Sequence, residues 1–275
     1  MKFELSETSY LTFSRFIQDK IGMVLSGNKQ YLVRGRLSSI AQSRNYTCIN
    51  AFLNDLIKEK DPALTERCIE LMTTNETYWF RDNYPYKLLE STILPAINKR
   101  QNKLRIWSSA CASGQEPYSI AMSLLEYKQS NPGAFARGVN VTGTDISTTM
   151  LEHCNYAHYD SLALARGLSP ERKKQFFEVG DNGMLKVKDE VKSLVNFRQM
   201  NLLNSYSLIG KFDIVFCRNV LIYFSAELKA QIISQIHGTL NPGGYLFLGA
   251  SESLSGFSDS FSMLRCNPGI VYQKK

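Results

Sequence analysis

The stretch Ser108–Ser119, SSACASGQEPYS, separates an apolar run at Leu104–Trp107 (LRIW) from an apolar run with helical spacing at Ile120–Tyr127 (IAMSLLEY). Its central residues are small, so the main chain there can come close to another group. A strand, a small-residue turn and a helix form the first unit of a doubly wound α/β sheet, in which ligands bind beyond the carboxyl ends of the strands. We therefore expect a ligand to lie against this turn.

Strand and helix patterns alternate along the chain after this turn. Apolar strand patterns occur at residues 139–147, 194–203, 211–219 and 245–252, and helical patterns occur at residues 116–130, 147–159 and 225–240. Strands separated by helices form a parallel sheet that is covered on both faces. The last helix is expected to stop at NPGG, residues 241–244. The pattern predicts an α/β fold with a doubly wound, mostly parallel sheet.

Two segments carry hairpin signals that interrupt the alternation. In QFFEVGDNGMLKVKDE two alternating runs meet at GDNG, residues 180–183, which predicts a small antiparallel β-subdomain inserted at about residues 162–192. The tail FSMLRCNPGIVYQKK, residues 261–275, turns at NPG and predicts an antiparallel edge strand. Residues 1 to 90 show helical spacing only. We therefore divide the chain into a helical domain at 1–75, a linker at 76–92 and an α/β domain at 93–275.

Composition excludes several classes of protein. The chain has 275 residues, of which 44% are hydrophobic and 21% charged, with a net charge of +7, so we expect a globular protein with an acidic partner. The start of the chain does not resemble a signal peptide, and no run is long enough to span a bilayer. The six cysteines form no C-x-x-C pair and the three histidines lack metal-ligand spacing. These features predict a soluble, cytoplasmic protein with reduced thiols and no metal site.

The residues around the turn narrow the choice of ligand. The sequence ACASGQE is not the G-x-G-x-x-G dinucleotide fingerprint, and it is poorly suited to cradle a pyrophosphate. The second strand ends at Asp145, where a carboxylate can accept hydrogen bonds from ribose hydroxyls. Asp145 could instead cap the helix that follows. An adenosine without a diphosphate fits both the turn and Asp145.

Five motifs occur in order over nearly the whole chain: TTNETYWFRD (Thr73–Asp82), SSACASGQEPYSIAM (Ser108–Met122), TGTDIS (Thr142–Ser147), FDIVFCRNVLIYF (Phe212–Phe224) and NPGGYLFLGASE (Asn241–Glu252). In these motifs the chain resembles the CheR family of chemotaxis receptor methyltransferases. The resemblance implies a class I S-adenosylmethionine-dependent methyltransferase fold with an all-helical N-terminal domain and an inserted antiparallel β-subdomain. It also implies S-adenosylmethionine as the cofactor, with S-adenosylhomocysteine as its product.

The resemblance implies that the acceptors are side-chain carboxylates of specific glutamates in chemoreceptors, which become methyl esters during sensory adaptation. The cofactor-binding residues that it carries over are Asn75, Thr77, Arg81, Glu116, Asp145, Asn201, Leu202, Arg218 and Asn219. It places Arg81 and Tyr223 nearest the reacting groups, as catalytic residues, and it implies no metal. A cytoplasmic enzyme recruited to membrane-bound receptor arrays is expected, without membrane insertion.

Simple chemistry agrees with these roles and leaves alternatives open. Arg81 can hold an incoming carboxylate, and Tyr223 can orient it through its hydroxyl group. Taken alone, Arg81 could be a solvated charge, Tyr223 a core residue, and Glu116 an acid placed favourably at a helix N-terminus. An amine or nucleic-acid methyltransferase and a non-catalytic binder are the competing functions. The arginine in CRNVLIY, residues 217–223, suits an acidic acceptor and argues against N-methylation.

The helical domain offers a route to the acidic partner. Between Tyr10 and Asn54 the only acid is Asp19, whereas the basic residues are Arg15, Lys20, Lys29, Arg34, Arg36 and Arg44. We expect these basic helices to dock on the acidic methylation region of chemoreceptors, with Arg36 and Arg44 on one helix face. In the family that the chain resembles, members that bind a C-terminal receptor tether peptide through the inserted sheet have a longer turn there, so the short turn at residues 180–183 implies no strong binding of such a peptide. The sequence predicts no nucleic-acid partner and identifies no regulatory protein.

Overall fold

The computed structural model describes residues 4–25, 27–98, 103–254 and 259–275. The chain forms two compact units, Met1–Thr74 with Tyr223–Ala230, and Asn75–Ile222 with Gln231–Lys275. The sequence analysis did not anticipate the short second segment of the helical unit. Within the described ranges, none of the helices combines the length and the apolar character needed to cross a bilayer.

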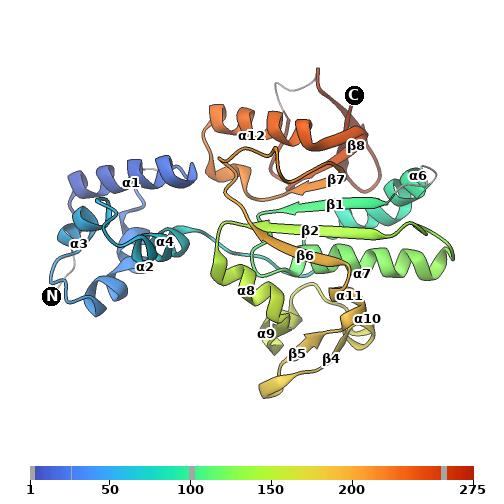
Figure 1. Ribbon diagram of the computed structural model, residues 1–275, viewed down its shortest axis with the longest axis horizontal. Coiled ribbons are helices and arrows are strands. Elements are labelled where there is room, and N and C mark those ends of the chain that lie inside the picture. Colours follow the sequence, from blue (N-terminus) through green and yellow to red (C-terminus); the bar gives the residue numbers. More distant parts are fainter. Residues whose placement is uncertain (1–3, 26, 99–102, 255–258) are drawn as a thin grey trace. The chain divides into compact units, whose positions relative to one another are not determined.

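The first unit is built from four amphipathic helices (Figure 1), which are α1 (Glu7–Ile21), α2 (Gln30–Ser43), α3 (Ile49–Leu56) and α4 (Pro62–Met72). Their starts follow local sequence signals. The Ser6 hydroxyl accepts a hydrogen bond from the Ser9 N–H, and the Asp61 carboxylate accepts one from the Leu64 N–H, as N-cap residues do. Apolar residues at helical spacing, including Phe13, Ile17 and Leu37, are completely buried.

The contacts of Arg36 correct the expectation that this residue belongs to the docking face of the helical unit. Its guanidinium donates to the carbonyls of Met72 and Thr73, at 2.6 and 2.7 Å, and to the Thr74 hydroxyl at 3.1 Å. These carbonyls belong to the end of α4, where main-chain acceptors lack helical partners. Arg36 therefore holds the C-terminus of α4 and cannot be treated as a free docking charge.

The second unit contains a seven-stranded sheet in the order β6-β2-β1-β7-β8-β10-β9. Figure 1 labels its strands β6, β2, β1, β7 and β8. The strands are β1 (Leu104–Ser109), β2 (Val139–Asp145), β6 (Val195–Gln199), β7 (Phe212–Cys217), β8 (Leu240–Leu248), β9 (Phe261–Arg265) and β10 (Ile270–Lys274). Strands β6, β2, β1, β7 and β8 are parallel, and β10 is antiparallel to both of its neighbours. This is the predicted mostly parallel sheet closed by the predicted C-terminal hairpin. One detail differs, because NPGG lies inside β8 rather than before it.

The helices of the second unit are α5 (Tyr84–Leu88), the π-helix η1 (Leu89–Ile93), α6 (Leu94–Asn98), α7 (Gln115–Ser130), α8 (Thr148–Tyr156), α9 (Ser161–Ala165), α10 (Pro170–Phe176), α11 (Asp189–Lys192), the 3₁₀ turn η3 (Leu221–Tyr223) and α12 (Ala226–Thr239). The residue Tyr223 and the start of α12 belong to the first unit. The segment expected as a linker is helical from Tyr84 onward, and Tyr86, Leu88 and Leu89 are buried in the main core. It is therefore part of the second unit.

The inserted subdomain is a three-stranded antiparallel sheet, in the order β3-β5-β4. Its strands are β3 (His158–Tyr159), β4 (Phe177–Val179) and β5 (Leu185–Val187), and the 3₁₀ turn η2 (Asp181–Gly183) joins the last two, as the GDNG signal predicts. The buried Trp79 ring packs edge-on against Tyr159 and Phe177, with ring centroids 4.8 and 5.2 Å away. This packing attaches the segment that precedes α5 to the small sheet.

The cysteines differ sharply in their expected reactivity. All six are free, and Cys48 is exposed ahead of α3. Hydrogen bonds from the main-chain N–H groups of Ala51 and Asn50 lower the pKa of Cys48, whereas burial raises the pKa of Cys68 to about 12. Because the thiolate is the reactive form, we expect iodoacetamide to modify Cys48 before Cys68 in the native protein. Mass spectrometry of peptides after brief labelling checks this, and equal labelling of the two thiols would contradict it.

Candidate functional site

The turn between β1 and α7 has the geometry expected of a ligand-contacting loop. Ala110, Ala112 and Gly114 have positive φ angles of 57°, 46° and 93°. Non-glycine residues rarely adopt this conformation, and such strain concentrates at functional sites. A Cβ on Gly114 would meet the Cys154 Sγ and the Tyr159 hydroxyl, each at 3.1 Å. The small residues therefore serve both the backbone conformation and the packing beneath it.

Asp145 lies at the carboxyl end of β2 and links this turn to the next one. Its side chain accepts hydrogen bonds from the Ala112 N–H at 2.8 Å and from the Ser147 N–H at 3.0 Å. The residue is 6% exposed. The helix-cap alternative for Asp145 is wrong, because the Ser147 hydroxyl caps α8 by accepting from the Met150 N–H. Asp145 is thus a buried carboxylate held at the edge of the sheet where ligands bind.

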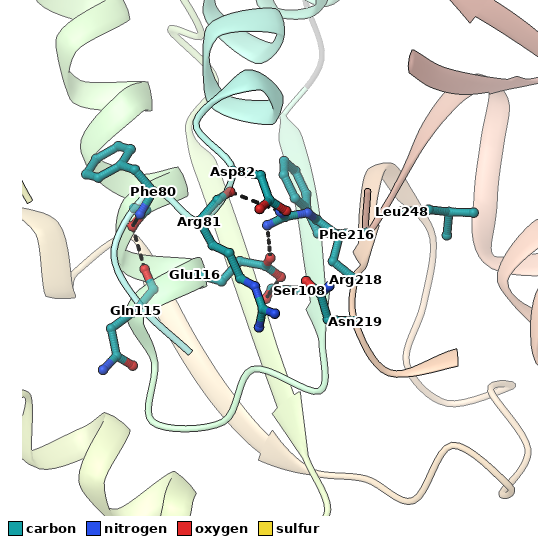
Figure 2. A network of polar contacts seen from close by, with 12 residues as sticks. Phe80, Arg81, Asp82, Ser108, Gln115, Glu116, Phe216, Arg218, Asn219 and Leu248 are labelled. Carbon is teal, nitrogen blue, oxygen red and sulfur yellow. Dashed lines mark hydrogen bonds and ion pairs between the residues drawn. The ribbon is translucent and has the colours of Figure 1, made fainter. Parts of the chain in front are cut away.

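Glu116 and Arg218 form the centre of a buried polar network (Figure 2). The Glu116 carboxylate accepts from the Ser108 hydroxyl and from the Arg218 guanidinium, both at 2.8 Å. Arg218 also donates to the Asp82 carboxylate at 2.7 Å and to the Arg81 carbonyl at 2.9 Å. The network joins β1, α7 and the end of β7 to the segment before α5. The analysis of the sequence singled out Glu116 and Arg218 but missed Asp82 and Ser108.

The electrostatics of Arg218 follow from its surroundings. The side chain is 1% exposed. Burial alone would lower its pKa, but the negative charge of Glu116, together with that of Asp82, outweighs burial and raises the pKa above its usual value. Arg218 is therefore a permanent cation within the unit. Its Nε has no hydrogen-bond partner among the described residues, so one buried donor stays available in the network.

The segment before α5 carries three residues implied by the motif NETYWFR. Asn75 and Thr77 are partly buried and lie outside regular structure. The Arg81 guanidinium donates to the Glu76 carbonyl at 2.9 Å and lies over the Tyr78 ring, 5.4 Å from its centroid. In Figure 2 the Arg81 side chain extends past Glu116 toward Asn219.

Asn219 follows β7 and has a positive φ of 58°. Its N–H donates to the Glu252 carboxylate at 2.8 Å, and the Gly249 N–H donates to the same oxygen at 2.7 Å. Glu252 was missed by the sequence analysis, although it stands in the motif GASE directly after β8. The signal that identified Asp145, a carboxylate just beyond a parallel strand, would also have found Glu252.

Asn201 and Leu202 follow β6 at the same edge of the sheet. The Asn201 side chain accepts from the Leu203 N–H at 3.0 Å, and Leu202 is 8% exposed. Tyr223 is the predicted site residue that falls in the first unit, where its carbonyl accepts from the Val24 N–H at 2.9 Å. Its catalytic role stays a prediction.

The residues at this edge fit an adenosine with an amino-acid tail. A carboxylate offers about four acceptor positions, so Asp145 is a suitable acceptor for a ribose hydroxyl. The small-residue turn admits a close ligand, and Leu202 offers an apolar side chain at the same edge of the sheet. No group of three or more His, Cys, Asp or Glu side chains among the described residues has the arrangement of a metal site.

Comparison with known families gives a consistent result over both units. The model "CheR methyltransferase, all-alpha domain" matches residues 8–73, and "CheR methyltransferase, SAM binding domain" matches residues 75–270. The chain is 52% identical to a chemotaxis protein methyltransferase of Vibrio parahaemolyticus, covering 98% of both chains. It is 51% identical to chemotaxis protein methyltransferase 1 of Vibrio cholerae, again over 98% of both, and 48% identical to Cher2 of Pseudomonas putida, over 96% of both.

Proposed function

The chain belongs to the CheR methyltransferase family, and from that membership we propose that it transfers the methyl group of S-adenosylmethionine to side-chain carboxylates of specific glutamates in chemoreceptors. The observation that carries the proposal is the match of both family models along the chain. The products are glutamate methyl esters and S-adenosylhomocysteine. The binding of S-adenosylmethionine is a property of the matched domain itself.

The chemistry asks for orientation and desolvation rather than proton transfer. S-adenosylmethionine supplies an electrophilic methyl group on a cationic sulfur. A glutamate side chain is ionised near neutral pH, so no general base is needed. Positioning the carboxylate oxygen in line lowers the barrier through effective concentration, and excluding water favours the loss of charge in the transition state.

We assign the named residues to binding and orientation. Asp145 accepts from the ribose hydroxyls, and the turn that its carboxylate holds admits the ligand. Asn201 and Leu202 lie beside the adenine. Asn75 and Thr77 contact the cofactor from the segment before α5.

The remaining cofactor assignments follow the polar network. Glu116 faces the methionine moiety and, with Arg218, keeps the main chain at Arg81 in place, while Asn219 completes this side of the site. Arg81 holds one oxygen of the incoming carboxylate and leaves the other free to react, because binding both would weaken the nucleophile. Tyr223 orients the free oxygen.

Receptor-bearing membranes provide the experiment that tests this function. Incubation with methyl-labelled S-adenosylmethionine should place label on receptor protein, and mild alkali should release it, because a methyl ester is hydrolysed. Arg81→Ala should depress the rate. Label that resists alkali would indicate N-methylation or nucleic-acid methylation instead. A protein that binds the cofactor but never transfers the label would be a non-catalytic binder.

Substitution of Asp145 tests its proposed contact with the ribose of the cofactor. We expect Asp145→Ala to weaken S-adenosylhomocysteine binding by about 1.5 to 3 kcal/mol, the usual contribution of hydrogen bonds to a charged group. Isothermal titration calorimetry measures the affinity. Ser147→Ala is the matched control, since it removes the α8 cap but keeps the carboxylate, and it should leave affinity unchanged. Equal affinity of Asp145→Ala and wild type would overturn the ribose assignment.

The proposed receptor surface is the basic helical unit, without Arg36. Arg15 on α1 and Arg34 on α2 are exposed, and neither has a hydrogen-bond or ion-pair partner among the described residues. Reversing both, with Arg15→Glu and Arg34→Glu, should slow receptor methylation about tenfold, because complementary charge accelerates encounter. The rate of the wild type should also fall with added salt.

The control for this charge reversal is Lys173→Glu with Lys174→Glu, an exposed pair on α10. It changes the net charge equally but lies in the other unit. Both double variants should bind S-adenosylhomocysteine normally. Normal receptor methylation by Arg15→Glu with Arg34→Glu would show that docking occurs elsewhere. We further propose a cytoplasmic enzyme recruited to receptor arrays, with no strong tether binding at the η2 turn.

A further inference from the structure

A basic hollow of about 450 Å³ lies on the main sheet. It is lined by Lys103, Arg105, Asn140, Asn196 and Arg198. Arg105 pairs with Asn140 across β1 and β2, near the amino ends of these strands. Arg198 lies closer to the carboxyl end of its strand, where it pairs with Thr144 of β2. None of the lining residues is among those assigned to the cofactor.

The connection from β6 to β7 carries no helix that would cover this part of the sheet. Residues 200–211 form turns, although a parallel crossover usually covers the sheet with a helix. Tyr206 from this connection packs edge-on against the buried Trp107, with ring centroids 5.4 Å apart. The connection thus covers part of this face with turns rather than with a helix.

Within the part of the chain that the structure describes, no acidic side chain pairs with the three cations at the hollow. Lys103 and Arg198 have no ion pair or side-chain hydrogen bond among the described residues. The Arg105 guanidinium lies over the Phe212 ring, 5.2 Å from its centroid. A Cβ on Gly210 would lie 2.9 Å from the Arg105 Nη2. Arg105 is therefore held in place by packing and keeps its hydrogen-bond donors.

The side-chain amides of Asn140 and Asn196 add further hydrogen-bond donors to the hollow. The Thr142 hydroxyl contacts the side-chain oxygens of both Asn140 and Asn196, at 3.2 and 3.1 Å. This leaves the two amide nitrogens as the groups that face away from Thr142. The nearby Asp213 carboxylate is occupied by the Arg105 N–H and the Asn241 amide, both at 2.9 Å. The hollow therefore presents three cations and two amide donors.

We propose that this hollow binds the phosphate groups of a small molecule, a nucleotide or a free polyphosphate. Phosphate oxygens are strong acceptors that match guanidinium and amide donors. The volume lies within the range of small-molecule sites. The hollow shares no lining residue with the proposed cofactor site, so a phosphate ligand and the cofactor can occupy the protein together.

Titration calorimetry tests the proposal on the whole chain saturated with S-adenosylhomocysteine, which blocks adenosine binding at the cofactor edge. The probes are tripolyphosphate and guanosine triphosphate. We expect both to bind the wild type. Tighter binding of guanosine triphosphate would identify a nucleotide, and equal binding would identify the phosphates alone; both outcomes support the site.

Two variants test whether the two probes bind at the hollow. Lys103→Ala with Arg198→Ala removes two exposed, unpaired cations and should weaken both probes at least about tenfold. Asn140→Asp keeps the side-chain shape and the acceptor for Thr142 but places a negative charge in the hollow, so it should also lose binding. Lys173→Ala with Lys174→Ala is the matched control for net charge, and it should bind both probes within about twofold of wild type.

Three results would overturn the proposal. The first is that neither probe binds the wild type. The second is that the control pair loses as much affinity as the pair at the hollow. The third is that a DNA or RNA oligonucleotide displaces both probes and binds through Lys103 and Arg198, which would make the face a nucleic-acid surface. Circular dichroism and thermal unfolding of each variant establish that it is folded before titration.

Discussion

Arg218→Met should lower the free energy of unfolding by about 3 to 5 kcal/mol, the usual cost of removing one partner from a buried ion pair. The Arg218 side chain is 1% exposed and pairs with Glu116 and Asp82. Its loss leaves the buried Glu116 carboxylate with the Ser108 hydroxyl alone, besides removing the donor to the Arg81 carbonyl. Urea unfolding followed by circular dichroism measures the change.

A double substitution tests the physical cause of this loss. Arg218→Met with Glu116→Gln removes both charges of the closer pair, so it should recover part of the stability that the single change loses. Arg218→Lys keeps the charge but not the planar fork of donors, so its effect should lie between those of wild type and Arg218→Met. If the double variant is as unstable as the sum of its single changes, the network is not a coupled unit.

Gly167→Ala should destabilise the second unit by about 3 kcal/mol or more, because the new methyl group has no room. Gly167 has a φ of 81°, and a Cβ there would clash with the Trp79 carbonyl oxygen and lie 2.9 Å from the carbonyl carbon. Trp79 precedes Arg81 in the segment assigned to the cofactor. The variant should therefore also weaken S-adenosylhomocysteine binding, measured by calorimetry beside urea unfolding.

Gly133→Ala separates the steric clash from the backbone strain. Gly133 has a similar φ of 86°, but nothing lies within 4 Å of a Cβ built on it. Its substitution should cost about 1 kcal/mol, the contribution of the left-handed conformation alone. Equal destabilisation by the two changes would show that the Trp79 segment moves aside freely.

Much of the fold could be read from local patterns. The helices of the first unit, the alternation that builds the parallel sheet and the GDNG and NPG hairpins depend on side-chain period and turn residues within short windows. Two boundaries could not be read in this way. NPGG lies within β8, and the expected linker continues from Tyr84 as helices packed in the core. In both places tertiary contacts override the turn and linker signals.

The residues of the candidate site also fall into those that the sequence predicted and those that it missed. Asp145 was predicted because parallel strands place their carboxyl ends at one edge of the sheet, and Glu116 was predicted from the family resemblance. Asp82 and Glu252 were missed, although both stand within recognised motifs, because their importance lies in partners far along the chain. Arg218 binds an Asp82 that is 136 residues away.

By itself, the sequence determined the type and order of the elements, the small-residue turn and the carboxylates that follow the strands. Only the tertiary structure decided which charges are paired. It turned Arg36 into the clamp of a helix end and buried Arg218 between two carboxylates. It also left Lys103, Arg105 and Arg198 around an uncovered face of the sheet. The physical reason is range: periodicity acts between neighbours in sequence, whereas a hydrogen bond or ion pair depends on atoms brought within about 3 Å by the whole fold.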